Sequence, residues 1–180
     1  VAICDDFDGT LAPGNMQEHI FIPKIGLEAA DFWSTVREEA KVHDADEILT
    51  YMRLMLDRAQ VARVPVRREH IRKYGAGLHL FEGVAEWFPR MTEMGRQNGV
   101  NVEHFIISSG LREMIEGTSI ARYFKKIFAS AFVYDHNEVA VWPALAVNYT
   151  TKTQFLFRIN KGQLEAWDNS RINAFVPPDE

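Results

Sequence analysis

Two aspartates one residue apart follow a short apolar segment at the start of the sequence. The segment Val1-Ala2-Ile3-Cys4 leads, through Asp5, into Asp6-Phe7-Asp8-Gly9-Thr10. A short apolar run that ends in acidic residues and glycine predicts a buried strand followed by a loop, and parallel sheets bind ligands at that end of their strands. The carboxylate of Asp6 can attack phosphorus and form an acyl phosphate. Asp8 can protonate the leaving oxygen and then activate water.

The segment Asp6-x-Asp8-Gly9-Thr10-Leu11 resembles the first motif of the haloacid dehalogenase (HAD) superfamily. The resemblance implies an α/β fold, a Rossmann-like parallel-sheet core with the nucleophile at the tip of the first strand. It also implies phosphoryl transfer, because the dehalogenases of this superfamily lack the second aspartate. A halide leaves without a proton, whereas an ester oxygen needs one.

Two further segments match later motifs of the superfamily. The run Phe105-Ile106-Ile107-Ser108-Ser109-Gly110 is an apolar strand that ends in serine. The resemblance implies that Ser108, the Ser109 N-H and Thr10 bind the phosphoryl group, and that a lysine at the start of a later helix assists them. Lys152 fits this lysine best. Lys161 is the rival, but it lies at a helix end, where a cation commonly interacts with the helix dipole.

The proposed attack requires a cation, because an anionic carboxylate and an anionic phosphate repel each other by several kcal/mol at intermediate dielectric. We expect Lys152 and a bound Mg²⁺ to provide the positive charge. The expected metal ligands are the Asp6 carboxylate and the backbone oxygen of Asp8, with water completing the shell.

The fourth motif of the superfamily, one or two acidic residues after another apolar strand, has no match after Lys152. Asp168 follows Leu164-Glu165-Ala166-Trp167, a poor strand, and is interpreted as a turn residue. Either the motif lies beyond Glu180, which the abrupt ends of the sequence favour, or the chain binds metal weakly and is inactive. We expect the first.

The periodicity predicts a helical module between the first strand and the second motif. Helical spacing dominates from about residue 17 to 78, before a further helix at 82–96 that is broken or kinked near Pro89. Strands are expected at 102–107, 127–134 and 138–147, and a last helix from Thr150 or Thr151 to Asn160. We predict a core of residues 1–14 and 79–180 and a helical cap of residues 15–78, as in the phosphoserine phosphatase branch.

Two features of this module bear on specificity. Its basic residues Arg63, Arg67, Arg68, Arg72 and Lys73 are interpreted as a solvated helix face or, secondarily, a contact for a second anionic group. Glu18 lies near the position of a cap glutamate in phosphoserine phosphatases, but out of register, so phosphoserine is one candidate substrate among several.

Composition limits the partners. The chain has 180 residues and a formal net charge of -5, so its overall field repels nucleic acid and anionic membranes. One cysteine excludes an intrachain disulfide and fits a reducing compartment, by default the cytoplasm. No segment resembles a signal peptide or a membrane span.

The sequence therefore predicts a HAD-like phosphatase that hydrolyses a small phosphorylated metabolite. A phosphotransferase or mutase of the same fold is the alternative within enzymes. An inactive HAD-like binding module is the alternative outside them, supported by the absent fourth motif.

Overall fold

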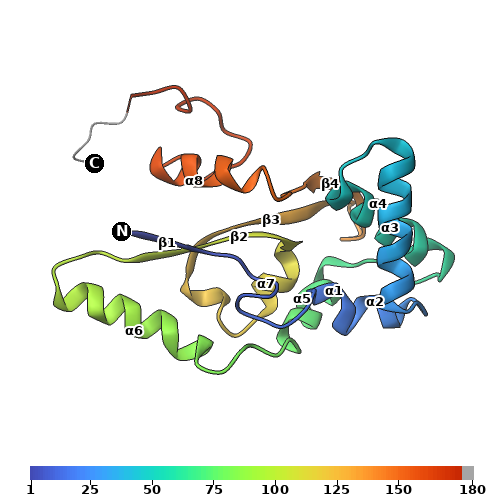
Figure 1. Ribbon diagram of the computed structural model, residues 1–180, viewed down its shortest axis with the longest axis horizontal. Coiled ribbons are helices and arrows are strands. Elements are labelled where there is room, and N and C mark those ends of the chain that lie inside the picture. Colours follow the sequence, from blue (N-terminus) through green and yellow to red (C-terminus); the bar gives the residue numbers. More distant parts are fainter. Residues whose placement is uncertain (176–180) are drawn as a thin grey trace.

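The computed structural model describes residues 1–175 as a sheet with helices on both faces and a group of helices at one end (Figure 1). The elements are β1 (Ala2–Asp5), α1 (Met16–His19), α2 (Phe21–Lys24), α3 (Ala29–His43), α4 (Glu47–Val61), α5 (Arg68–Ala76), α6 (Val84–Gln97), β2 (Glu103–Leu111), α7 (Arg112–Gly117), a 3-10 turn (Ala121–Tyr123), β3 (Phe124–Tyr134), β4 (Ala140–Leu145) and α8 (Lys152–Asn160). None of the helices in this part of the chain is long and apolar enough to cross a membrane.

The sheet has the order β1-β2-β3-β4. β1 pairs with β2 and β2 with β3 in parallel, so the carboxyl ends of these three strands meet at one edge. β4 runs antiparallel to β3 and completes a hairpin. The predicted Rossmann-like α/β fold is confirmed, with an antiparallel strand added to the parallel core.

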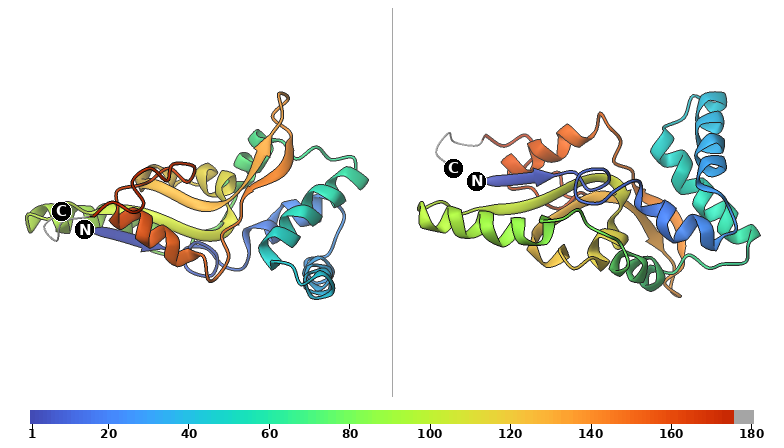
Figure 2. Two further views of the ribbon diagram at one scale, coloured as in Figure 1. Left: turned by 90° about the horizontal axis from the view of Figure 1, so that it is seen from above. Right: turned by 60° about the horizontal axis from the view of Figure 1, so that its bottom comes forward.

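Alternation along β2 sends apolar side chains into two separate cores. Phe105 and Ile107 pack with Phe155 of α8 on one face, while Ile106 packs with Phe88 of α6 on the other. Both views of Figure 2 show the sheet between α8 and the α6 and α7 layer. α6 is continuous through Pro89, so of the expected break or kink at this residue the break is wrong.

Helices α1 to α5 all lie between β1 and β2 in sequence, and α3 and α4 form an upright pair at one end of the molecule (Figure 1). α5 instead packs closely on α7 through glycines. A Cβ at Gly75 would lie 1.8 Å from the Met114 carbonyl oxygen, and one at Gly117 would lie 1.8 Å from the Arg72 carbonyl oxygen. The division into a core and a cap of residues 15–78 stays a prediction.

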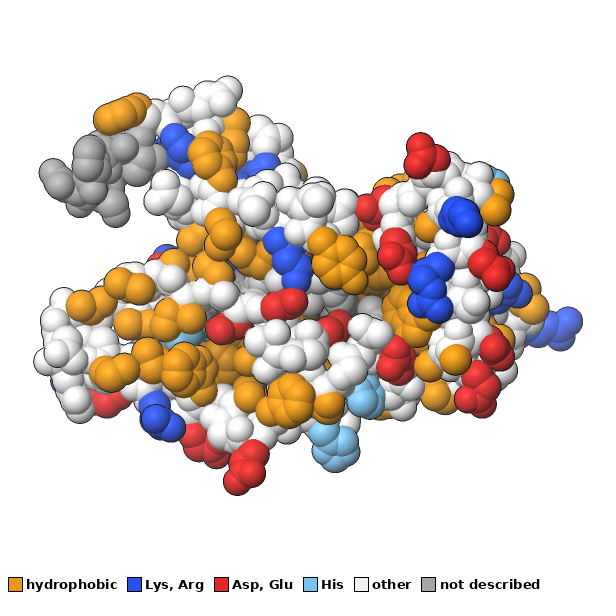
Figure 3. All heavy atoms as spheres, viewed as in Figure 1, with side chains coloured by type: hydrophobic (Ala, Val, Ile, Leu, Met, Phe, Trp, Pro, Cys, Tyr) orange, Lys and Arg blue, Asp and Glu red, His pale blue; other side chains and the backbone are white. Residues whose placement is uncertain are grey.

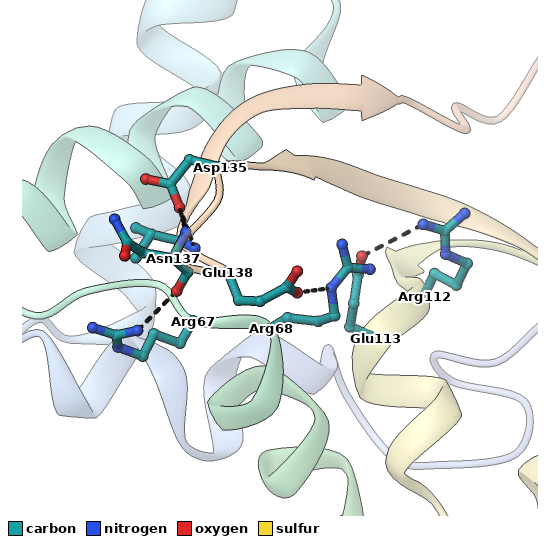
Figure 4. A network of polar contacts seen from close by, with 8 residues as sticks. Arg67, Arg68, Arg112, Glu113, Asp135, Asn137 and Glu138 are labelled. Atoms are coloured by element: carbon teal, nitrogen blue, oxygen red, sulfur yellow. Dashed lines mark hydrogen bonds and ion pairs between the residues drawn. The ribbon is translucent and has the colours of Figure 1, made fainter.

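The basic residues at the start of α5 contact the β3-β4 hairpin (Figure 4). Arg67 donates a hydrogen bond to the Asn137 carbonyl, and Arg68 forms an ion pair with Glu138. The Arg68 guanidinium also lies 4.0 Å from the centre of the Tyr134 ring. These two arginines therefore hold the hairpin against α5.

Candidate active site

Asp6 lies directly after β1, and its carboxylate contacts a lysine from the far end of the chain. Lys152 Nζ lies 2.5 Å from Asp6 Oδ2, although 146 residues separate them. Asp6 Oδ1 accepts a hydrogen bond from the Phe7 N-H at 2.8 Å. The Asp6 side chain is 38% exposed and remains open to a ligand.

Asp8 lies in a more buried environment. Its Oδ1 accepts a hydrogen bond from the Met16 N-H at 3.1 Å. Burial raises the pKa of Asp8 to about 7, while the Met16 N-H acts against this shift and the charges of Asp6 and Glu18 add to it. A carboxyl group with this pKa can hold a proton near neutral pH and can also lose it, as a group that alternates as acid and base requires.

The last residues of β2 face this carboxyl group. Ser108 is fully buried, and its hydroxyl accepts a hydrogen bond from the Gly110 N-H at 3.0 Å. A Cβ at Gly110 would lie 2.8 Å from Asp8 Oδ2, so the absence of a side chain at Gly110 lets Asp8 approach this end of the strand. Ser109 has a buried hydroxyl without a hydrogen-bond partner in the described chain.

The structure brings Asp6 to Lys152 and Asp8 to the Ser108-Ser109-Gly110 segment, but it separates two other residues from them. Thr10 is exposed in the turn after Asp8, where its N-H bonds to the Phe7 carbonyl at 3.2 Å. Lys161 lies at the other end of α8 and donates to the Ala174 carbonyl.

The start of α8, which positions Lys152, is organised by Asn148. Its Oδ1 accepts from the Thr150 and Thr151 N-H groups at 3.1 and 2.8 Å, so the helix is not capped by the expected threonine hydroxyls. Asn148 Nδ2 also donates to Asp46 Oδ2 at 2.6 Å, which links this loop to the start of α4. No local sequence pattern indicates this contact, because 102 residues separate the two.

A cavity of about 560 Å³, here called the Asp8 cavity, opens beside the carboxylates. Asp8, Ser109 and Tyr149 line it from the core side, and side chains of α1, α3 and α4 line the opposite side. Figure 3 shows acidic and basic side chains gathered between the core and α3 and α4. A group attached to a phosphate at Asp6 and Asp8 would extend into this cavity.

Sequence reasoning missed three residues at this cavity. Met16 holds Asp8 through its N-H, and Tyr51 donates its hydroxyl to the Ser109 carbonyl at 2.8 Å. Gln17 is buried in the cavity wall. No local sequence pattern indicates these contacts, because the burial of Gln17 and Tyr51 follows from tertiary packing.

The acidic donors suit Mg²⁺ in type. Within residues 1–175 no group of three or more His, Cys, Asp or Glu side chains is arranged to hold a metal ion. Mg²⁺ at phosphoryl sites commonly uses one or two carboxylates together with substrate phosphate and water, and Asp6 and Asp8 offer such oxygens. Asp168 accepts from the Ser170 N-H at 2.9 Å, in keeping with a turn residue.

Comparisons of sequence give one relative and no family model that matches the chain. An uncharacterized protein of Borreliella burgdorferi is 28% identical over 207 aligned residues, which cover 98% of this chain and 68% of that protein.

Solved structures similar to this chain include the following three proteins. An HAD family hydrolase from Salmonella enterica serovar Typhi aligns with a TM-score of 0.60 at 17% identity, over 88% of this chain and 50% of its own length. A phosphoserine phosphatase, solved as a phospho-aspartyl intermediate analogue, aligns with a TM-score of 0.62 at 15% identity, over 90% of this chain and 71% of that protein. A phosphoserine phosphohydrolase-like protein from Francisella tularensis gives 0.55 at 18% identity, over 86% of this chain and 72% of that protein.

These likenesses establish the fold. The chain spans half the length of the Salmonella hydrolase and has the HAD-like fold that the Asp6 motif predicts.

Proposed function

We propose that this protein is a Mg²⁺-dependent phosphatase that hydrolyses a small phosphomonoester through an aspartyl phosphate at Asp6. The contact between Asp6 and Lys152 carries the proposal, because it places a cation on the carboxylate that must meet an anionic phosphate. The HAD-like fold of the hydrolase and phosphatase neighbours supports it.

In the first step, a carboxylate oxygen of Asp6 forms a bond to phosphorus while the bond from phosphorus to the ester oxygen breaks. Asp8 donates its proton to that oxygen, and the alcohol leaves. In the second step, Asp8 takes a proton from water, whose oxygen attacks phosphorus and releases inorganic phosphate from Asp6. The pKa of about 7 suits Asp8 to both roles.

The remaining residues position the phosphoryl group. The Ser108 and Ser109 end of β2 and the ammonium of Lys152 offer hydrogen-bond donors to its oxygens. Mg²⁺ would be held by the Asp6 carboxylate and the backbone oxygen of Asp8, where it neutralises charge on the phosphate. Thr10 stays a candidate for phosphate binding through movement of its exposed turn.

A panel of phosphomonoesters tests the proposal on the full-length protein. Inorganic phosphate should be released from at least one ester with Mg²⁺ present, and release should stop in EDTA. A phosphorylated acceptor in place of inorganic phosphate would instead identify a phosphotransferase. No reaction with any ester would favour the binding module.

The cytoplasm remains the expected compartment, because a chain with a single cysteine fits a reducing environment.

A further inference from the structure

The wall of the Asp8 cavity contains a buried amide oxygen that no group of the described chain satisfies. Gln17 of α1 is 2% exposed, and its Oε1 has no hydrogen-bond partner within residues 1–175. The Ser109 hydroxyl, on the core side of the same cavity, is also buried without a partner. Because an unpaired buried polar group is costly, the pair indicates space for a ligand that supplies the missing hydrogen bonds.

The charges around the cavity indicate the sign of that ligand. Asp8, Glu18 and Glu47 line it together with one basic residue, Arg37 at the exposed rim. Glu18 is held in place because its Oε1 accepts from Trp33 Nε1 and from Asn15 Nδ2, each at 2.6 Å. Asp8 carries its proton when it acts as the acid, but Glu18 and Glu47 together outweigh Arg37, so the cavity still favours a positively charged group.

Aromatic side chains form a further part of the wall. The rings of Trp33 and Tyr51 meet edge to face with their centres 5.7 Å apart, and both residues line the cavity. Aromatic faces attract ammonium groups. The free acceptor at Gln17, the acidic charge and the aromatic wall therefore select for the same kind of group.

We infer that Gln17 is a specificity-determining residue whose Oε1 accepts a hydrogen bond from a primary ammonium group on the leaving alcohol. The substrate class is then the phosphate ester of a small amino alcohol. This inference depends on the proposed phosphatase function and adds no step to it. Asp8 still protonates the ester oxygen, and the ammonium group leaves unchanged with the alcohol.

Four esters separate the features of the leaving group on the full-length protein with Mg²⁺. Phosphoethanolamine carries N-H donors and a positive charge, phosphocholine carries the charge without N-H donors, glycerol 2-phosphate carries hydroxyl donors without charge, and phenyl phosphate carries neither. The inference predicts that kcat/KM for phosphoethanolamine exceeds each of the other three by about tenfold or more, since one hydrogen bond to a charged group is at stake.

Variants then assign the preference to Gln17. In Gln17→Leu the ratio of kcat/KM between phosphoethanolamine and phenyl phosphate should fall about tenfold or more, chiefly through KM. Gln17→Glu keeps an acceptor and should retain or increase the ratio, which also tests the inference if the leucine variant does not fold. Gln60→Leu, on α4 outside the cavity, is the matched control.

The outcomes distinguish failure of the Gln17 inference from failure of the proposed phosphatase function. Phenyl phosphate hydrolysis without preference for phosphoethanolamine, or an unchanged ratio in Gln17→Leu, overturns the inference and leaves the phosphatase proposal intact. Preference for phosphocholine or glycerol 2-phosphate overturns it as well. Failure to hydrolyse any of a broad set of phosphomonoesters removes the proposed function and the inference with it.

Discussion

Lys152 Nζ and Asp6 Oδ2 lie 2.5 Å apart and join the first strand of the sheet to α8. Asp6 follows the first strand, and Lys152 opens the last helix of the described chain. They meet because the carboxyl end of β1 and the start of α8 lie at the same edge of the sheet (Figure 1). An ion pair this open to solvent adds little to stability, so its value is in the chemistry of the site.

Removal of the Lys152 ammonium should impair phosphate release far more than it impairs folding. Lys152→Ala leaves the Asp6 carboxylate without its cation, so we expect kcat/KM to fall by about a hundredfold or more. The measurement is phosphate release from an active ester with Mg²⁺. Lys161→Ala, at the other end of α8, is the control and should lower kcat/KM only slightly. The reverse order would assign the catalytic cation to Lys161.

Glu113 predicts a pH dependence of stability that is independent of the catalytic carboxylates. Its side chain is fully buried at the start of α7, and neither carboxylate oxygen has a hydrogen-bond partner in the described chain. Arg112 Nη2 lies 3.6 Å from Oε1 (Figure 4). Burial raises the pKa of Glu113 above its ordinary value of 4.5.

A group with a raised pKa in the folded state loses its contribution to stability as the pH rises above its ordinary value. Glu113→Gln removes this loss, so the free energy of unfolding of the variant, relative to wild type, should increase as the pH rises above the ordinary pKa of 4.5 and should level off once Glu113 is ionised in the folded protein. Urea unfolding of both proteins in EDTA, repeated across this pH range, measures the difference in free energy of unfolding. Glu116→Gln on the same helix, 35% exposed, is the control. If the difference in free energy of unfolding between Glu113→Gln and wild type is the same at all pH values, the pKa of Glu113 is not raised in the folded protein and the prediction is wrong.

Gly75 tests the close packing of α5 on α7. Gly75→Ala would place a methyl group 1.8 Å from the Met114 carbonyl oxygen, so the helices must separate. We expect a loss of about 2 kcal/mol in the free energy of unfolding. Gly77→Ala is the matched control, because its Cβ would lie 3.3 Å from the movable end of the Ile20 side chain. Similar stability of the two variants would contradict the close contact.

Much of the fold and of the candidate site could be predicted from local patterns. The apolar run before Asp6 predicted β1, and the apolar run before Ser108 predicted β2. β2 is buried on both faces, which accounts for its continuous apolar sequence. β1 is the first strand in the sheet order of the described chain and is only partly buried, so the expected burial of this strand is wrong. The D-x-D-G-T segment pointed to the carboxylate pair, since its residues are adjacent in sequence. Motif order then pointed to Lys152.

The remaining features depend on contacts between distant segments. Pro89 was expected to break or kink α6, but the helix continues through it, with Phe88 packed against Tyr123 and Phe124. The role of Asn148 at the start of α8 and the position of Gln17 in the cavity wall follow from tertiary packing alone. Periodicity detects a buried face of a helix, but not which cavity a polar residue on that face lines.

The most direct test of the account is the activity of Asp6→Asn, since every step proposed here passes through that carboxylate. The variant should keep the fold, measured by circular dichroism and thermal unfolding, because Asp6 is a partly exposed residue at the edge of the sheet. Mg²⁺-dependent release of phosphate from phenyl phosphate should disappear. Undiminished release by a correctly folded Asp6→Asn protein would contradict the mechanism.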